Sequence, residues 1–132
     1  MKKFFVVVLT LALTLSLFGC GEPKVNKDLS ENAVAALESA IETLDAFLDY
    51  DITAEVAEEK LERIKNSLAG SEEFYDEMAY FSMTAAHLAV SNYGVRERSN
   101  ERMESIGGPT NANDMGSVRD SRDSLYNLLY RK

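Results

Sequence analysis

Apolar residues recur at helical spacing through most of the chain after residue 28. Between Asp28 and Asp49 one set of large apolar side chains stands three or four positions apart, and six acidic residues lie outside this set. The apolar positions are Val34, Leu37, Ile41, Leu44 and Leu48. This spacing gives a helix one apolar face. Asp28, with Glu31 three residues later, supplies an N-cap acceptor and an acidic first turn. We therefore expect the first helix of the domain to begin at Asp28.

A second amphipathic helix is predicted after a short connection. Thr53 is a suitable N-cap, and Ile52 before it is placed to pack on the first turn. The apolar positions of this helix are Ala57, Leu61, Ile64 and Leu68. Gly70 is typical of a residue that follows the end of a helix. Because the connection is short, the first two helices must be antiparallel neighbours.

The third helix is predicted to be the most buried. It begins at Ser71, and the segment from Met78 to Val90 contains no acidic residue, lysine or arginine. Its apolar residues form two stripes. One stripe consists of Phe74, Met78, Phe81, Ala85 and Leu88, and the other of Tyr80, Met83, His87 and Val90. A helix that is apolar on two faces is expected to pack against two sides of a bundle.

Residues 95–106 leave two interpretations open, because they carry charge on nearly every side. They either continue the third helix or form a short helix of their own, and Gly94 favours a break. Residues 107–117 are rich in turn formers, and Asp114 is a suitable cap for a last helix. No segment has the alternation of a strand. The sequence thus predicts an all-α fold, a small antiparallel helical bundle of four helices, or five, after a cleaved N-terminal signal helix.

The first twenty residues follow another pattern. Lys2 and Lys3 precede an uncharged, strongly apolar run, which is the layout of a signal peptide. The run ends in Leu17-Phe18-Gly19-Cys20, which resembles the lipobox of bacterial lipoproteins. Leu17 and Gly19 match that pattern, whereas Phe18 departs from it, because small or β-branched residues are more common there. The resemblance implies cleavage between Gly19 and Cys20 and a diacylglyceryl group, with fatty chains such as palmitate, on the Cys20 sulfur.

Two other interpretations of this segment stay open. The uncharged stretch of residues 4–21 is eighteen residues long, the lower limit for a membrane span, so an uncleaved anchor is one alternative. An ordinary secretory peptide followed by an unmodified thiol is the other. With lipidation, residues 1–19 are the signal peptide, residues 20–27 a lipidated tether and residues 28–132 an acidic helical domain. Lipid on Cys20 would hold the domain at the cell membrane or outer membrane, on the extracytoplasmic side.

The domain is strongly acidic. Removal of residues 1–19 takes away two lysines and no acid, which changes the net charge from −8 to −10. This charge argues against nucleic-acid binding, which requires a basic surface. Residues 28–77 contain fifteen acidic and three basic residues, whereas residues 96–132 contain six and seven. We expect ion pairs between the last helix and the first two. An acidic face for a cationic partner is the alternative.

No residue pattern indicates a catalytic, metal or cofactor site. The segment from Asp49 begins like a calcium-binding loop, but Ala54 and Lys60 occupy the positions of the required glycine and glutamate. The chain has one histidine, His87, and Thr84 stands where a diiron motif needs an acid. We therefore predict no enzyme activity, no metal and no cofactor, and a core or boundary position for His87.

Two functions fit such a domain. One is a membrane-anchored interaction module for a protein partner of the cell envelope, which predicts an exposed apolar patch of several hundred Å2. The other is a carrier of a small apolar ligand, which predicts an internal pocket above about 300 Å3. Aromatic and methionine side chains of the third helix are typical of core residues, and they are also the candidates for an apolar binding surface. They are Tyr75, Met78, Tyr80, Phe81, Met83 and His87.

Overall fold

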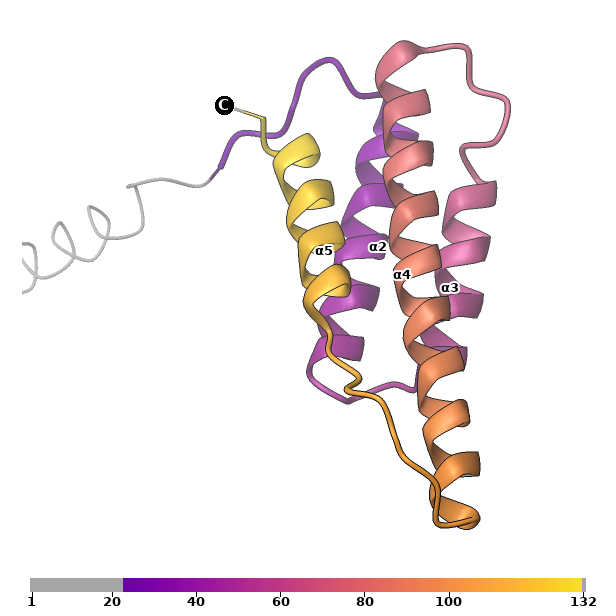
Figure 1. Ribbon diagram of the computed structural model, residues 1–132. Coiled ribbons are helices and arrows are strands. Elements are labelled where there is room, and N and C mark those ends of the chain that lie inside the picture. Colours follow the sequence, from indigo (N-terminus) through magenta and orange to yellow (C-terminus); the bar gives the residue numbers. More distant parts are fainter. Residues whose placement is uncertain (1–22, 132) are drawn as a thin grey trace, which may run out of the picture.

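The computed structural model describes residues 23–131, which form a bundle of four helices (Figure 1). The helices are α2 (Glu31–Leu48), α3 (Ala54–Asn66), α4 (Phe74–Ser105) and α5 (Gly116–Leu129). Successive helices run in opposite directions, and α5 packs back against α2. The predicted all-α antiparallel bundle is confirmed, and residues 23–131 contain no strand. The predicted signal helix, the lipobox and Cys20 lie outside the described residues.

The core receives one stripe of side chains from each helix. Its largest fully buried members are Leu37, Leu44, Leu61, Met83, Val90, Val118, Leu125 and Leu129. Alanines on α2, α3 and α4 lie between these larger residues and are also fully buried. Small side chains at such positions let helix axes approach, so the larger residues can interdigitate at the density of a protein interior.

The start of α2 differs from the prediction. The N-cap is Ser30, whose hydroxyl oxygen accepts a hydrogen bond from the Ala33 backbone N–H at 3.1 Å. Asp28 lies exposed in the preceding turn, so the expected cap is wrong by two residues. Thr53 does cap α3, as predicted, by accepting from the Val56 N–H at 3.4 Å.

The end of α2 is closed by a tight turn. The Asp51 N–H donates to the Ala46 carbonyl at 2.9 Å, and the Tyr50 N–H donates to the Phe47 carbonyl at 3.1 Å. This pair of bonds is the Schellman motif, which places one residue in the left-handed region. Tyr50 occupies that position with a φ of 62°, although glycine is the usual residue there. The segment that resembled the start of a calcium loop is therefore a helix-ending turn.

Helix α4 is continuous through Gly94. Of the two interpretations left open by the sequence, the continuation is the one observed, and the break that Gly94 favoured does not occur. Residues 95–105 extend α4 past the end of the other helices (Figure 1). Gly94 is buried where α4 meets the start of α3, and a Cβ atom added there would lie 3.1 Å from the Ala54 Cβ atom. The glycine thus permits a close approach of two helices. The helix begins at Phe74, three residues after the predicted start at Ser71.

The connection after α4 returns along that helix before α5 begins. The Asn100 side chain holds Asn111 at two points: its Nδ2 donates to the Asn111 carbonyl at 2.8 Å, and its Oδ1 accepts from the Asn111 N–H at 3.0 Å. Asn113 Nδ2 donates to the Tyr93 carbonyl at 3.3 Å. Burial and the neighbouring Glu97 raise the pKa of the Tyr93 phenol above its ordinary value. These contacts set the position from which α5 packs onto the bundle.

The segment before α2 is fastened to the end of α5. Asn26 is buried, its backbone N–H donates to the Leu129 carbonyl at 2.7 Å, and its Nδ2 donates to the Leu128 carbonyl at 3.2 Å. These bonds satisfy carbonyls that the end of a helix leaves free. Leu29 packs into the core nearby. The folded body therefore begins at Asn26.

Candidate interaction surface

The two predicted apolar stripes of α4 differ in burial. In one of them Met83 and Val90 are fully buried, whereas Tyr80 and His87 are half-buried at its edge. The core-facing side of the helix carries Asp76, Ala79, Met83, Ala86 and Val90, all buried. The stripe that begins at Phe74 lies on the opposite side and is open to solvent. Its large members and their exposed fractions are Phe74 at 66%, Met78 at 39%, Phe81 at 64%, Leu88 at 55% and Val95 at 54%. The prediction that α4 would bury both stripes is wrong.

The exposed stripe has a regular seven-residue repeat. Ala85 and Asn92, also exposed, complete it, so that alternating steps of four and three residues run from Phe74 to Val95. We call this set, Phe74, Met78, Phe81, Ala85, Leu88, Asn92 and Val95, the α4 stripe. Such spacing is that of the a and d positions of a coiled coil. An isolated surface apolar residue needs no explanation, but a continuous stripe three heptads long does.

The area of the α4 stripe is that of an interaction surface. If a whole phenylalanine side chain presents about 200 Å2, Phe74 and Phe81 together expose about 260 Å2. Met78, Leu88 and Val95 add to this area. A patch of several hundred Å2 is as large as the largest on a typical monomer and is often functional.

The six residues predicted for an apolar surface do not lie together. Met78 and Phe81 belong to the α4 stripe, whereas Met83 is fully buried and cannot contribute to a surface. Tyr75, Tyr80 and His87 are half-buried along the edges of α4. The Tyr75 hydroxyl accepts from Arg131 Nη1 at 2.8 Å, and His87 Nε2 lies 3.9 Å from Glu58 Oε1. The structure adds Phe74, Leu88 and Val95, and their heptad spacing is the signal that could have identified them.

Charge along the α4 stripe is divided between its two ends. Glu77 flanks the N-terminal half, and Arg96 and Arg98 flank the C-terminal half, all of them exposed. Among residues 23–131, neither arginine takes part in an ion pair. One end of the stripe is therefore bordered by negative charge and the other by positive charge.

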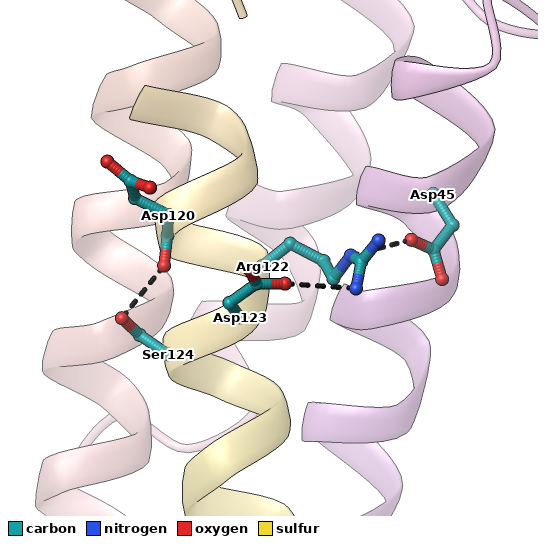
Figure 2. Close-up of polar contacts among 5 residues, drawn as sticks. All are labelled: Asp45, Asp120, Arg122, Asp123 and Ser124. Carbon is teal, nitrogen blue, oxygen red and sulfur yellow. Dashed lines mark hydrogen bonds and ion pairs between the residues drawn. The ribbon is translucent and has the colours of Figure 1, made fainter. Parts of the chain in front are cut away.

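Within residues 23–131, one ion pair joins the last helix to the first two, as the charge distribution predicts. Arg122 on α5 lies between Asp45 of α2 and Asp123 of its own helix (Figure 2). Its Nε is 2.9 Å from Asp45 Oδ1, and its Nη1 is 2.9 Å from Asp123 Oδ1. The Nε–H is not directed well enough at Asp45 to form a hydrogen bond, so this contact is an ion pair only. It joins α5 to α2 at a partly exposed position.

A buried carboxylate joins the N-terminal ends of α2 and α4. Asp76 is only 4% exposed and accepts three hydrogen bonds. Its Oδ1 accepts from the Ser30 N–H at 3.2 Å, and its Oδ2 accepts from the Ser30 hydroxyl at 2.6 Å and the Ser71 hydroxyl at 3.1 Å. Asp76 stands in the first turn of α4 and bonds to the N-cap of α2. Both helix dipoles favour a negative charge there. The arrangement is structural, because its polar atoms are paired within the protein.

Three open grooves offer space for small molecules. One of about 490 Å3 lies between α2 and α3 beside Ala36 and Ile64. One of about 500 Å3 lies beside Val25, and one of about 330 Å3 lies between Ile41 and Tyr126 of α5. None of the three is lined by α4, so they differ in place from the pocket predicted among its methionines and tyrosines.

Residues 23–131 contain no group of three or more His, Cys, Asp and Glu side chains placed to hold a metal ion. None of the four helices is both long enough and apolar enough to span a bilayer.

Comparison with known proteins gives no match, whether to a family model, a curated protein or a solved structure.

Proposed function

We propose that this protein is a lipid-anchored interaction module of the bacterial cell envelope that binds a protein partner through the α4 stripe. The observation that carries the proposal is the continuous exposure of Phe74, Met78, Phe81, Leu88 and Val95 on one face of a helix. Leaving so much apolar surface in water has a free-energy cost that a partner would remove.

The anchor is supported by the sequence alone. Lys2 and Lys3, the apolar run after them and the resemblance of residues 17–20 to a lipobox all favour lipid on Cys20. Two or more fatty chains hold a protein on a membrane stably. Anchoring confines the module to a surface, where weak contacts become effective because the local concentration of partners is high.

Photo-crosslinking in intact cells tests the interaction. The full-length chain is produced with a photoreactive phenylalanine analogue at position 88, and a matched chain carries it at Glu62, an exposed position of α3. We expect protein adducts from position 88 and none from position 62. Equal adducts from both positions, or no protein adduct from position 88, would contradict the proposal.

A second measurement tests the anchor independently. The Cys20→Ser chain should leave the membrane fraction, and mass spectrometry of the unaltered protein should find the Cys20 sulfur acylated. A bare thiol in the exported protein, or full membrane retention of Cys20→Ser, would contradict the proposed anchor.

A further inference from the structure

The heptad spacing of the α4 stripe indicates the shape of what covers it. An apolar seam with a seven-residue period fits another helix running nearly parallel to it, with side chains of each helix filling gaps of the other. On a straight helix such a seam drifts about 20° per heptad, which two helices accommodate by winding gently around each other. Helix α4 offers three heptads between Phe74 and Val95 for this contact. The occupant is therefore expected to be a helix of similar length.

The charges beside the seam indicate which helix. Glu77 and Arg98 are 21 residues apart, three whole heptads, so they occupy the same heptad position on the same side of the stripe. When two copies of a helix pair in opposite directions, equivalent flanking positions from opposite ends meet. Glu77 of each copy would then face Arg98 of the other, and the acidic end of each stripe would lie against the basic end of its counterpart.

We infer that the α4 stripe is covered by the α4 stripe of a second copy of this protein, packed antiparallel in a symmetric dimer. This inference rests on the proposed function and names its partner. In the arrangement that brings Glu77 and Arg98 together, Ala85 lies opposite Leu88 of the second copy, and Met78 lies opposite Val95. A small residue thus faces a large one at the centre of the dimer, as good packing requires.

The area and the symmetry both fit a dimer. Two stripes of several hundred Å2 each would bury on the order of 1,000 Å2 together, the lower end for a specific interface. Such a dimer is weak in dilute solution and is favoured where an anchor concentrates the chains on a surface. A twofold contact between identical patches is the most common form of protein assembly and closes on itself, so it leaves no stripe exposed.

Other occupants fit the observations less well. An anionic membrane surface would be repelled by Glu77 and by Glu72 and Glu73 just before α4. A parallel dimer would pair Asn92 with itself, but it would also bring both acidic ends together and both groups of arginines together. Of the two arrangements, only the antiparallel pair places each Glu77 opposite an arginine, Arg98 of the second copy, whereas Arg96 has no acidic partner across the seam.

Charge reversal on the full-length lipidated protein in neutral detergent micelles tests this arrangement, with dimerisation measured by energy transfer between differently labelled chains. Glu77→Arg alone and Arg98→Glu alone should each weaken dimerisation about tenfold, because each places like charges together twice in the dimer. The chain carrying both substitutions should recover to within about threefold of the unaltered protein. Glu104→Arg and Arg119→Glu, exposed changes of the same charge away from the stripe, should have no such effect.

The outcomes separate this inference from the proposed function. A dimer that forms without compensation between Glu77→Arg and Arg98→Glu, including a parallel one, would overturn the antiparallel arrangement. If the protein remains monomeric but position 88 crosslinks to a different protein in cells, the inference fails while the proposed function stands. Crosslinks to lipid alone would overturn both. Circular dichroism of each variant would verify that the substituted chains keep their helical content.

Discussion

Replacing Asp76 should destabilise the fold more than replacing any exposed acid. Asp76→Ala removes the acceptor of three hydrogen bonds at a site that is 4% exposed. Each hydrogen bond to a charged group stabilises the fold by about 1.5–3 kcal/mol. Burying the carboxylate charge has a desolvation cost, and removing the carboxylate removes this cost, which offsets part of the loss. We expect a net loss of about 2–4 kcal/mol. A domain of this size has a free energy of unfolding of about 5–15 kcal/mol, so the loss is a large fraction.

Two further variants separate the hydrogen bonds from general effects of substitution. Asp76→Asn keeps the shape of the side chain and one acceptor oxygen, and the two serine hydroxyls can rotate to accept hydrogen bonds from its amide. We therefore expect Asp76→Asn to lower the free energy of unfolding by about half as much as Asp76→Ala. Glu77→Ala removes an exposed acid from the same turn of α4 and should change stability by less than about 0.5 kcal/mol.

Urea unfolding of chains lacking residues 1–19 and carrying Cys20→Ser, followed by circular dichroism at 222 nm, would measure these differences. A change in midpoint with a constant slope reports a change in stability. If Asp76→Ala and Glu77→Ala unfold within 0.5 kcal/mol of each other, the carboxylate does not hold the ends of α2 and α4 together, and this interpretation of the network is refuted.

Three smaller perturbations test other parts of the bundle in the same unfolding assay. Gly94→Leu should lower the free energy of unfolding by about 1–3 kcal/mol because the added side chain overpacks against Ala54, and Ala54→Gly in the same chain should restore part of the loss. Equal stability of Gly94→Leu and the unaltered protein would contradict the close approach of α3 and α4. Tyr50→Gly should stabilise by about 1 kcal/mol by relieving a positive φ at an exposed residue, so a loss of stability would show that the tyrosine side chain matters. Arg122→Gln and Asp45→Asn should each cost less than about 1 kcal/mol, and their double-mutant coupling should fall in high salt; a salt-independent coupling would contradict a partly exposed ion pair.

Helices α2 and α3 could be predicted from the sequence because their signals are local. Thr53 caps α3 by a bond to a residue three positions away, and the apolar residues of both helices have a single face to bury. The start of α2 could not be placed in this way. Asp28 and Ser30 are both good caps, and the choice between them is set by Asp76, which lies 46 residues further along the chain and bonds to Ser30.

The exposure of one apolar face of α4 could not be predicted from the sequence, because apolar content alone does not decide burial. The two faces contain similar numbers of apolar residues, but the buried one carries Ala79, Ala86 and Gly94, which allow helices to approach closely. The exposed one carries Phe74 and Phe81, which would hold a neighbouring helix further away. Asp76 also falls in register with the buried residues, and this polar residue in an otherwise apolar line obscured the pattern.

The proposed anchor and the inferred dimer together determine how the protein would lie on a membrane. In an antiparallel pair the N-terminal ends of the two α4 helices are about 38 Å apart along the axis, at 1.5 Å per residue. Asn26 is bound to the end of α5, so only residues 21–25 lie between each folded body and the lipidated Cys20, and the six steps from Cys20 to Asn26 reach about 22 Å at most. Chains of that length cannot bring both anchors to one bilayer while α4 stands upright. The dimer must therefore lie with α4 along the membrane surface.

Neutron reflectometry on a supported bilayer should find a protein layer about as thick as the bundle is wide. A layer about 48 Å thick, the length of the 32-residue helix α4, would show that the proposed anchor and the inferred dimer cannot both hold.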